Sequence, residues 1–218
     1  NAKAFAATPA VVGVIGPYNS DCAAEEIPVA NTARAGPVAM ISPTSSLAGL
    51  TRPGPFAPKA ALHALYPTGE RNYTRLFPTD ADQGAADALL AQRLGARRAF
   101  VVSDHGYGEP MAYYFRKAAA RIGLRIVGVA RWDPHAAGYA GLARRVEHAG
   151  PDMVFVSGLL DSNGGAVLRA VRKQVGRRVD VVATDGFLPI ADLFRLAGPA
   201  ARGVHVSLPG VPPIVLGP

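Results

Sequence analysis

Apolar residues in this chain fall in short runs that alternate with longer segments of helical period. Between residues 78 and 207, apolar runs stand at 99–103, 125–131, 153–157, 179–183 and 204–208. Short runs rich in β-branched residues predict buried strands, and apolar residues three or four apart predict amphipathic helices. Strands that alternate with helices in this way predict a doubly wound, five-stranded parallel sheet with helices on both faces.

The helices between these strands are predicted from the spacing of their apolar residues. The first places Ala86, Leu89, Leu90 and Leu94 on one face. The second, third and fourth show the same helical period. The predicted helices span residues 83–94, 109–122, 139–149, 165–175 and 190–197.

The N-terminal part of the chain predicts a βαβ unit. Val11–Ile15 and Pro37–Ile41 read as parallel strands, and Asp21–Ala35 between them has the length of a helix. Pro28 predicts either a kink in that helix or a later start. Residues 47–75 carry clusters of proline and glycine and are predicted to be irregular, with a short strand from Tyr73 to Phe77.

Two hydroxyl-rich turns follow the two strands of this βαβ unit, at Gly16–Ser20 and Ser42–Ser46. Parallel strands end at the same edge of a sheet, so the turns should lie side by side where open α/β sheets bind ligands. The first turn also leads into a helix N-terminus, whose free N–H groups favour an anion. The alternative is that both are ordinary turns, in which serine is common.

Strand ends in the second region carry further candidate residues. Tyr107 lies in the turn after the strand at 99–103, and Asp185 follows the strand at 179–183. An aspartate at such an edge suits a bound cation or ammonium group. It can equally be a helix cap or a turn residue.

Composition and charge exclude several classes of protein. The chain has 218 residues, is 49% hydrophobic, and contains no apolar run near membrane-spanning length. A single cysteine, Cys22, leaves no internal disulfide. The formal net charge is +7, but its basic pairs are dispersed, so we expect no binding to nucleic acid. These pairs are Arg97-Arg98, Arg144-Arg145, Arg172-Lys173 and Arg177-Arg178.

Signals of catalysis are weak. The chain has no phosphate-binding glycine loop, no nucleophile elbow and no dinucleotide fingerprint. Its five histidines lack metal-ligand spacing, and no base is placed beside the single cysteine. We therefore expect a protein that is not an enzyme, without catalytic residues, cofactor or metal.

Several stretches taken in order resemble the type I periplasmic solute-binding proteins of ABC importers, specifically the branched-chain amino-acid-binding (Leu/Ile/Val) group. The resemblance implies a two-lobed fold, each lobe a Rossmann-like parallel sheet between helices, with the ligand in the cleft between lobes. The first lobe would be incomplete here: residues 1–77 form part of it, 78–207 form the second lobe, and 208–218 form a second hinge crossing. The stretches are VVGVIGPYNS, GPVAMISPTSSLAGLT, YPTGERNYTRLFPTDADQGAA, Tyr107-Gly108, PDMVFVSG and TDGF.

The resemblance also implies roles for individual residues. Ser20 and Ser46 would hold the α-carboxylate of the ligand. The carbonyl of Thr44 and the carboxylate of Asp185 would bind its α-ammonium, and Tyr107 would close over it. Leucine preference does not follow, because residues 159–161 stand where relatives often carry aromatics. The predicted ligand-binding set also includes Tyr18, Asn19 and Leu160.

The function implied is capture of an amino acid or analogue and its delivery to a membrane permease. Such a protein is periplasmic or held at the cell surface, where a lipid anchor is one means of attachment, and we expect a monomer. The N-terminal residues show no apolar core of a signal peptide, so export would require a signal not present in this chain. A sensor of the same fold, which signals to a regulator or receptor, is the alternative, and an enzyme with a Rossmann-like lobe is the third.

Overall fold

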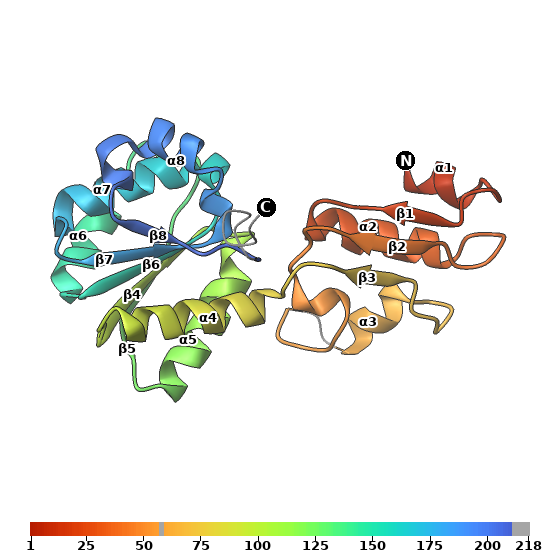
Figure 1. The fold of residues 1–218 in the computed structure, drawn as a ribbon, viewed down its shortest axis with the longest axis horizontal. Helices are drawn as coiled ribbons and strands as arrows, with labels where there is room; N and C mark the ends of the chain where they lie inside the picture. The colour runs from red at the N-terminus through yellow and green to blue at the C-terminus, as the bar shows by residue number, and fades with distance from the viewer. Residues whose placement is uncertain (57–58, 211–218) are drawn as a thin grey trace, which may run out of the picture. The chain divides into compact units, whose positions relative to one another are not determined.

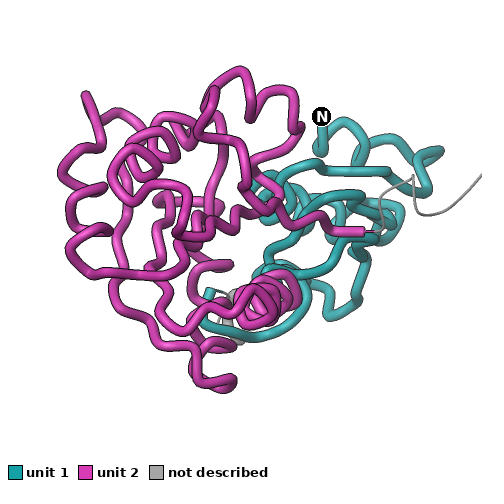
Figure 2. Tube along the Cα trace, turned by 60° about the vertical axis from the view of Figure 1, so that its left-hand side comes forward, with its two compact units in different colours: residues 1–80 teal, residues 81–218 magenta. Residues whose placement is uncertain are grey.

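A computed structural model describes residues 1–56 and 59–210 of the chain (Figure 1). The chain divides into two compact units, Asn1–Asp80 and the part from Ala81 onward (Figure 2). Of the predicted second hinge crossing at 208–218, residues 211–218 lie outside the described part. Each unit contains a parallel sheet packed against helices, so the predicted α/β fold class is confirmed.

The first unit is built on a three-stranded parallel sheet in the order β1-β2-β3. Its core joins Ile27, Met40, Leu50 and Tyr73, all at most 6% exposed. The predicted βαβ unit is confirmed. The elements are α1 (Ala2–Ala6), β1 (Gly13–Ile15), α2 (Ser20–Asn31), β2 (Ala39–Ser42), a 3₁₀ turn (Ala48–Leu50), α3 (Lys59–Leu65) and β3 (Tyr73–Arg75).

Two expectations for this unit are corrected. Helix α2 begins at Ser20 and continues past Pro28, so the later start is wrong. The turn after the proline is held by tertiary contacts, because the buried Asn31 amide donates to the carbonyl of Glu70 and to Asn72. The prediction of irregular structure over residues 47–75 is wrong at α3, whose sequence KAALHAL is rich in the helix formers alanine and leucine.

The second unit is built on a five-stranded parallel sheet in the order β5-β4-β6-β7-β8, which confirms the predicted topology. A short π-helical segment follows β6, and a 3₁₀ turn follows β7. The elements are α4 (Asp80–Arg93), β4 (Arg98–Ser103), α5 (Gly108–Arg121), β5 (Arg125–Arg131), α6 (Ala140–Ala149), β6 (Met153–Ser157), α7 (Gly165–Val175), β7 (Asp180–Ala183), α8 (Ile190–Ala197) and β8 (Val204–Val206).

Successive residues of the central strands pack into separate cores on the two faces of this sheet. Val102, Val154 and Val156 join the core formed with α6, α7 and α8. Val101 and Phe155 join the core formed with α4 and α5 on the other side (Figure 1). Because both faces are covered, the strands read as continuous apolar runs instead of alternating ones.

The apolar face predicted for α4 is buried only in part, because Leu90 and Leu94 pack against the core while Ala86 and Leu89 do not. Leu89 is 47% exposed, whereas the polar Gln83 and Asp87 are buried at 5% and 1%. Helix α5 lies close to α4 at Gly84, where an added Cβ would meet the backbone N of Phe115 at 2.8 Å. Small and polar residues therefore share the contact surface of α4 with Leu90 and Leu94. Of the other residues predicted on its apolar face, Ala86 is exposed, and Leu90 and Leu94 are half-buried.

The sheet core gives a first testable expectation. Phe155 is fully buried on β6 and stacks on Phe115 with ring centroids 4.1 Å apart. Phe155→Ala should lower the free energy of unfolding of this unit by about 3–5 kcal/mol through lost burial and a residual cavity. Urea unfolding followed by fluorescence of Trp132, which is 1% exposed, reports on the same unit.

The matched control is Phe194→Ala on α8, because Phe194 is 46% exposed. Its effect should stay within about 0.5 kcal/mol, as for most surface substitutions. Equal losses for the two variants would contradict the placement of Phe155 in the core.

Candidate functional site

In the first unit, the turns after β1 and β2 are joined by side-chain hydrogen bonds. The hydroxyl of Thr44 donates to the carbonyl oxygen of Tyr18 at 2.5 Å. The Oγ of Ser20 accepts the backbone N–H of Leu47 at 3.1 Å. Two turns that are 26 or 27 residues apart in the sequence therefore lie together at the carboxyl ends of the strands. This is the placement predicted from the parallel βαβ unit.

The remaining predicted residues of this unit differ in exposure. Ser46 is 3% exposed, and its carbonyl accepts the N–H of Asp80 at 3.0 Å. Tyr18 is 74% exposed, and Asn19 is exposed at the start of α2. The structure thus brings Tyr18, Ser20 and Thr44 together, while the ligand roles of all five residues stay predictions.

Arg75, at the end of β3, donates hydrogen bonds to the turn after β2 and to the residues that follow it. Sequence reasoning did not identify it. Its guanidinium donates to the carbonyls of Ser45 at 3.3 Å and Leu47 at 2.7 Å, and to the hydroxyl of Thr51 at 2.7 Å. Burial lowers the pKa of Arg75 from its usual value, yet arginine stays charged at physiological pH. The only sequence signal was a charged residue at the end of a short strand.

In the second unit, the structure brings Tyr107 and Asp185 together, and both are half-buried. Asp185 opens the 3₁₀ turn after β7, and Tyr107 precedes α5. The Tyr107 hydroxyl donates to Oδ1 of Asp185 at 2.7 Å, and Nε2 of Gln83 donates to the same oxygen at 2.8 Å. Within residues 1–56 and 59–210, no group donates a hydrogen bond to the other oxygen, Oδ2.

Hydrogen bonds continue from Gln83 to Ser207 and Asp87, and this partly buried polar network was also missed by sequence reasoning. Nε2 of Gln83 donates to Oγ of Ser207 at 2.8 Å, and that hydroxyl donates to Oδ2 of Asp87 at 3.3 Å. Burial, with a smaller contribution from the charge of Asp185, raises the pKa of Asp87 to about 8, and the Ser207 hydrogen bond opposes part of this rise. The signal available in the sequence was the polar pair Gln83 and Asp87, four residues apart on one helix.

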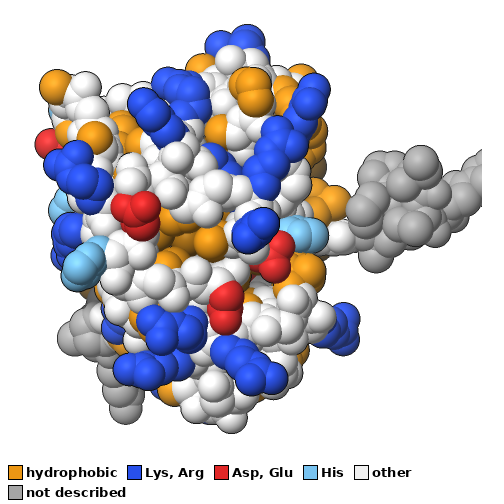
Figure 3. Space-filling model, turned by 90° about the vertical axis from the view of Figure 1, so that its left-hand side faces the viewer, with side chains coloured by type: hydrophobic (Ala, Val, Ile, Leu, Met, Phe, Trp, Pro, Cys, Tyr) orange, Lys and Arg blue, Asp and Glu red, His pale blue; other side chains and the backbone are white. Residues whose placement is uncertain are grey.

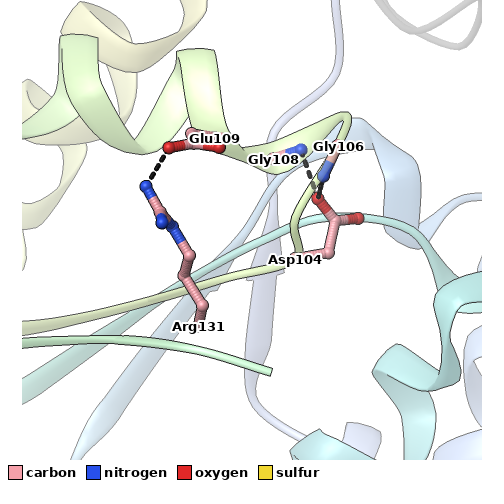
Figure 4. Close-up of polar contacts among 5 residues, drawn as sticks. All are labelled: Asp104, Gly106, Gly108, Glu109 and Arg131. Carbon is pink, nitrogen blue, oxygen red and sulfur yellow. Dashed lines mark hydrogen bonds and ion pairs between the residues drawn. The ribbon is translucent and has the colours of Figure 1, made fainter. Parts of the chain in front are cut away.

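Asp104, at the end of β4, fixes the turn that carries Tyr107 (Figure 4). Its Oδ1 accepts the backbone N–H groups of Gly106 at 3.2 Å and Gly108 at 2.6 Å. Its Oδ2 accepts the N–H of Leu159, in the loop after β6, at 3.1 Å. Burial raises the pKa of Asp104, and these three hydrogen bonds oppose that rise. The carboxylate therefore ties two loops at the carboxyl edge of the sheet.

The start of α5 is held in addition by an ion pair between Glu109 on the helix and Arg131 at the end of β5 (Figure 4). The loops at this edge approach so closely that glycine is required. An added Cβ on Gly186 would lie 2.1 Å from the carbonyl oxygen of Gly158. Leu160, predicted as a ligand contact, is 6% exposed in the core beside α6–α8, and its ligand role stays a prediction.

Other kinds of site find little support in the described residues. No group of three or more histidine, cysteine, aspartate or glutamate side chains there could hold a metal ion. None of the helices in residues 1–56 and 59–210 has the length and apolarity needed to cross a bilayer. Basic side chains on the face shown in Figure 3 lie in several small groups, with acidic and uncharged side chains between the groups.

Asp87 gives an expectation for the pH dependence of stability. The unfolded chain releases this proton near the ordinary value of 3.8, whereas the folded protein keeps it to about 8. The free energy of unfolding should therefore fall as pH rises through this window, by at most ~1.4 kcal/mol per pH unit. Asp87→Asn should remove that decline, and Asp161→Asn, at an exposed position, should not. Urea unfolding from pH 4 to 9 measures it, and parallel curves for wild type and Asp87→Asn would contradict it.

Comparison with solved structures places this geometry in a known fold. The leucine binding protein LivK of Thermotoga maritima is 21% identical with a TM-score of 0.67, over 87% of this chain and 48% of that chain. LivJ of Streptococcus pneumoniae, in complex with isoleucine, is 19% identical with a TM-score of 0.73, over 94% and 53%. A solute binding protein of Rhodopseudomonas palustris, in complex with 4-hydroxybenzoate, is 19% identical with a TM-score of 0.69, over 90% and 50%.

The chain spans about half the length of these solved relatives. At such identities the likeness shows the fold alone. A search of curated protein sequences finds no match. The family of periplasmic binding proteins matches residues 1–214, nearly the whole chain, which confirms the resemblance seen in the sequence motifs. The chain therefore belongs to the periplasmic binding protein family.

Proposed function

We propose that the protein is the exported solute-binding component of an ABC importer and that it captures an amino acid, branched-chain or related. Each unit carries candidate ligand-binding groups, and the loaded protein delivers its ligand to a membrane permease. Membership of the periplasmic binding protein family supports the solute-binding role. The single observation that carries the choice of ligand is the Asp185 carboxylate, with one oxygen held by two donors.

The first unit supplies the half of the site that suits a carboxylate. Ser20 stands at the first turn of α2, a 12-residue helix whose N-terminal N–H groups and dipole favour an anion. Ser46 lies on the neighbouring turn, which the cationic Arg75 holds through the backbone carbonyls of Ser45 and Leu47. Hydroxyl groups, free N–H groups and a nearby positive charge together stabilise a bound α-carboxylate.

The second unit supplies the half that suits an ammonium group. Asp185 is half-buried, and a carboxylate that loses its remaining water on ligand binding needs a cation to offset the cost. Tyr107 and Gln83 occupy Oδ1, so Oδ2 is the oxygen that would accept the charge-assisted hydrogen bond. A zwitterionic ligand satisfies both halves at once.

The solved relatives bind either amino acids or a hydroxybenzoate. The carboxylate of Asp185 in this chain suits the first class of ligand better than the second. Two of the relatives are described in complex with isoleucine and with leucine, and another with 4-hydroxybenzoate. Hydroxybenzoate carries a carboxylate but no cation, so it would leave Asp185 without a positive partner. The negative charge at this position therefore favours the amino-acid class for this chain.

Asp185→Asn tests the assignment. The variant should stay folded and lose roughly 2–5 kcal/mol of affinity for isoleucine, because the ammonium group loses its charged partner. Affinity for 3-methylpentanoate, the deaminated analogue, should hold or rise. Calorimetric titration of wild type and variant with both ligands measures the two effects.

The matched control is Asp192→Asn, which removes the same charge from an exposed ion pair with Arg195 on α8. It should leave both affinities unchanged. If wild type binds 4-hydroxybenzoate more tightly than isoleucine, or if Asp185→Asn binds isoleucine as wild type does, the amino-acid assignment is wrong.

Ser20→Ala tests the carboxylate half. Ser20 is half-buried, and a hydroxyl that donates to a charged acceptor contributes about 1–3 kcal/mol, so affinity for isoleucine should fall by up to that amount. Affinity for 2-methylbutylamine, which lacks the carboxylate, should not change. The same titration provides the readout, and an equal loss for acid and amine would show that Ser20 acts on the fold of the turn instead of on the ligand.

A further inference from the structure

A network of hydrogen bonds runs from Asp185 through Gln83 and Ser207 to Asp87. A single carboxylate could bind a ligand without so many supporting groups. We propose that Gln83 is a positioning residue that fixes the Asp185 carboxylate, and that it thereby sets how strongly the site prefers a ligand with a cationic group. The inference rests on the proposed function, since Asp185 is the group through which Gln83 acts. It concerns a residue on α4, remote in sequence from Asp185.

The geometry of the amide fixes its orientation. Nε2 of Gln83 donates to Oδ1 of Asp185 and to Oγ of Ser207, both at 2.8 Å, which uses its two hydrogens. A flipped amide would bring Oε1 against the carboxylate oxygen, which repels it. Gln83 is 5% exposed, so its side chain lies in the interior, although Asp185 and Ser207 are half-buried. The amide therefore has one orientation, the one in which it donates to Asp185.

Two donors on one oxygen restrict the carboxylate as well. Gln83 approaches Oδ1 from α4, and the Tyr107 hydroxyl approaches it from the turn before α5. Rotation of the carboxylate would break both hydrogen bonds, each to a charged acceptor. Tyr107 is half-buried, whereas Gln83 lies in the protein interior. Gln83 is therefore the more rigid of the two supports.

Asp87, at the other end of this hydrogen-bond network, is held in its neutral form and so adds no second negative charge near Asp185. Ser207 accepts from Gln83, so its own hydrogen is available to Oδ2 of Asp87 at 3.3 Å and to the carbonyl of Ala183 at 3.4 Å. The titratable group that faces Asp87 from another element is Asp185, and its charge disfavours ionisation of Asp87. With Asp87 protonated at neutral pH, this hydrogen-bond network contains a single carboxylate charge, which lies at Asp185.

Within this network of hydrogen bonds, one side-chain atom of Gln83 has no hydrogen-bond partner among the described residues. Oε1 of Gln83 is buried and accepts no hydrogen bond from the described residues. A buried acceptor without a donor costs stability. The cost is explained if the amide is held by its donor side, where it meets Asp185 and Ser207. A glutamine kept only for packing would not need to face a carboxylate.

The test replaces Gln83 with methionine, which has a similar size and shape but no N–H donors. Wild type should prefer isoleucine over 3-methylpentanoate. Gln83→Met should reduce that ratio of affinities by about tenfold to a hundredfold, the loss expected when a charged acceptor loses one donor. Gln92→Met is the control, because Gln92 lies on the same helix, is exposed and donates to the carbonyl of Ile122.

The outcomes separate the inference from the function on which it rests. A wild type without preference for isoleucine would overturn the proposed function and the inference with it. A wild type that shows the preference, with Gln83→Met either keeping it or weakening both ligands equally, would overturn the inference alone. If Gln83→Met does not fold, Ser207→Ala takes its place, since loss of the second acceptor should lower the ratio in the same direction. An unchanged ratio in that variant would also overturn the inference.

Discussion

A buried carboxylate that binds backbone N–H groups organises the edge of the second unit that bears Tyr107 and Asp185. Asp104 accepts three such hydrogen bonds from two loops, and it is 3% exposed. Hydrogen bonds to a charged acceptor stabilise by about 1.5–3 kcal/mol each, which offsets the cost of removing the carboxylate from water. Asp104 therefore supports the turn before α5, together with the Glu109–Arg131 ion pair, and this turn carries Tyr107 to Asp185.

The first unit uses the same solution with the opposite charge. Arg75 donates to two carbonyls and a hydroxyl of the turn after β2, so it replaces the regular hydrogen bonds that an irregular segment cannot make. In both units a charged side chain at a strand end organises the loop that bears the candidate residues. The charges also match the proposed ligand groups. Arg75 places a positive charge beside the turn proposed to bind the carboxylate, and Asp185 is the negative group proposed to bind the ammonium.

The sequence was sufficient for the topology and insufficient for the supports of the site. Alternating apolar runs predicted the parallel sheet, and strand ends predicted that Tyr107 and Asp185 share an edge, because these inferences use local patterns. Gln83 and Asp87 were missed because helical periodicity assumes that the apolar face of α4 is buried, while Leu89 in fact faces solvent. The buried hydrogen bonds join residues 102 and 124 positions apart, and no local pattern records such pairs.

The polar face of α4 connects stability with specificity. Burying Gln83 and Asp87 contributes less to stability than apolar side chains of the same volume would. The loss is limited because Asp87 is neutral when folded and because Gly84 lets α5 pack closely on the same face. What the fold gains is a carboxylate at Asp185 whose orientation does not depend on the ligand. In the role proposed for Asp185, a carboxylate organised before binding would spend less of the ligand's interaction energy on ordering its own side chains.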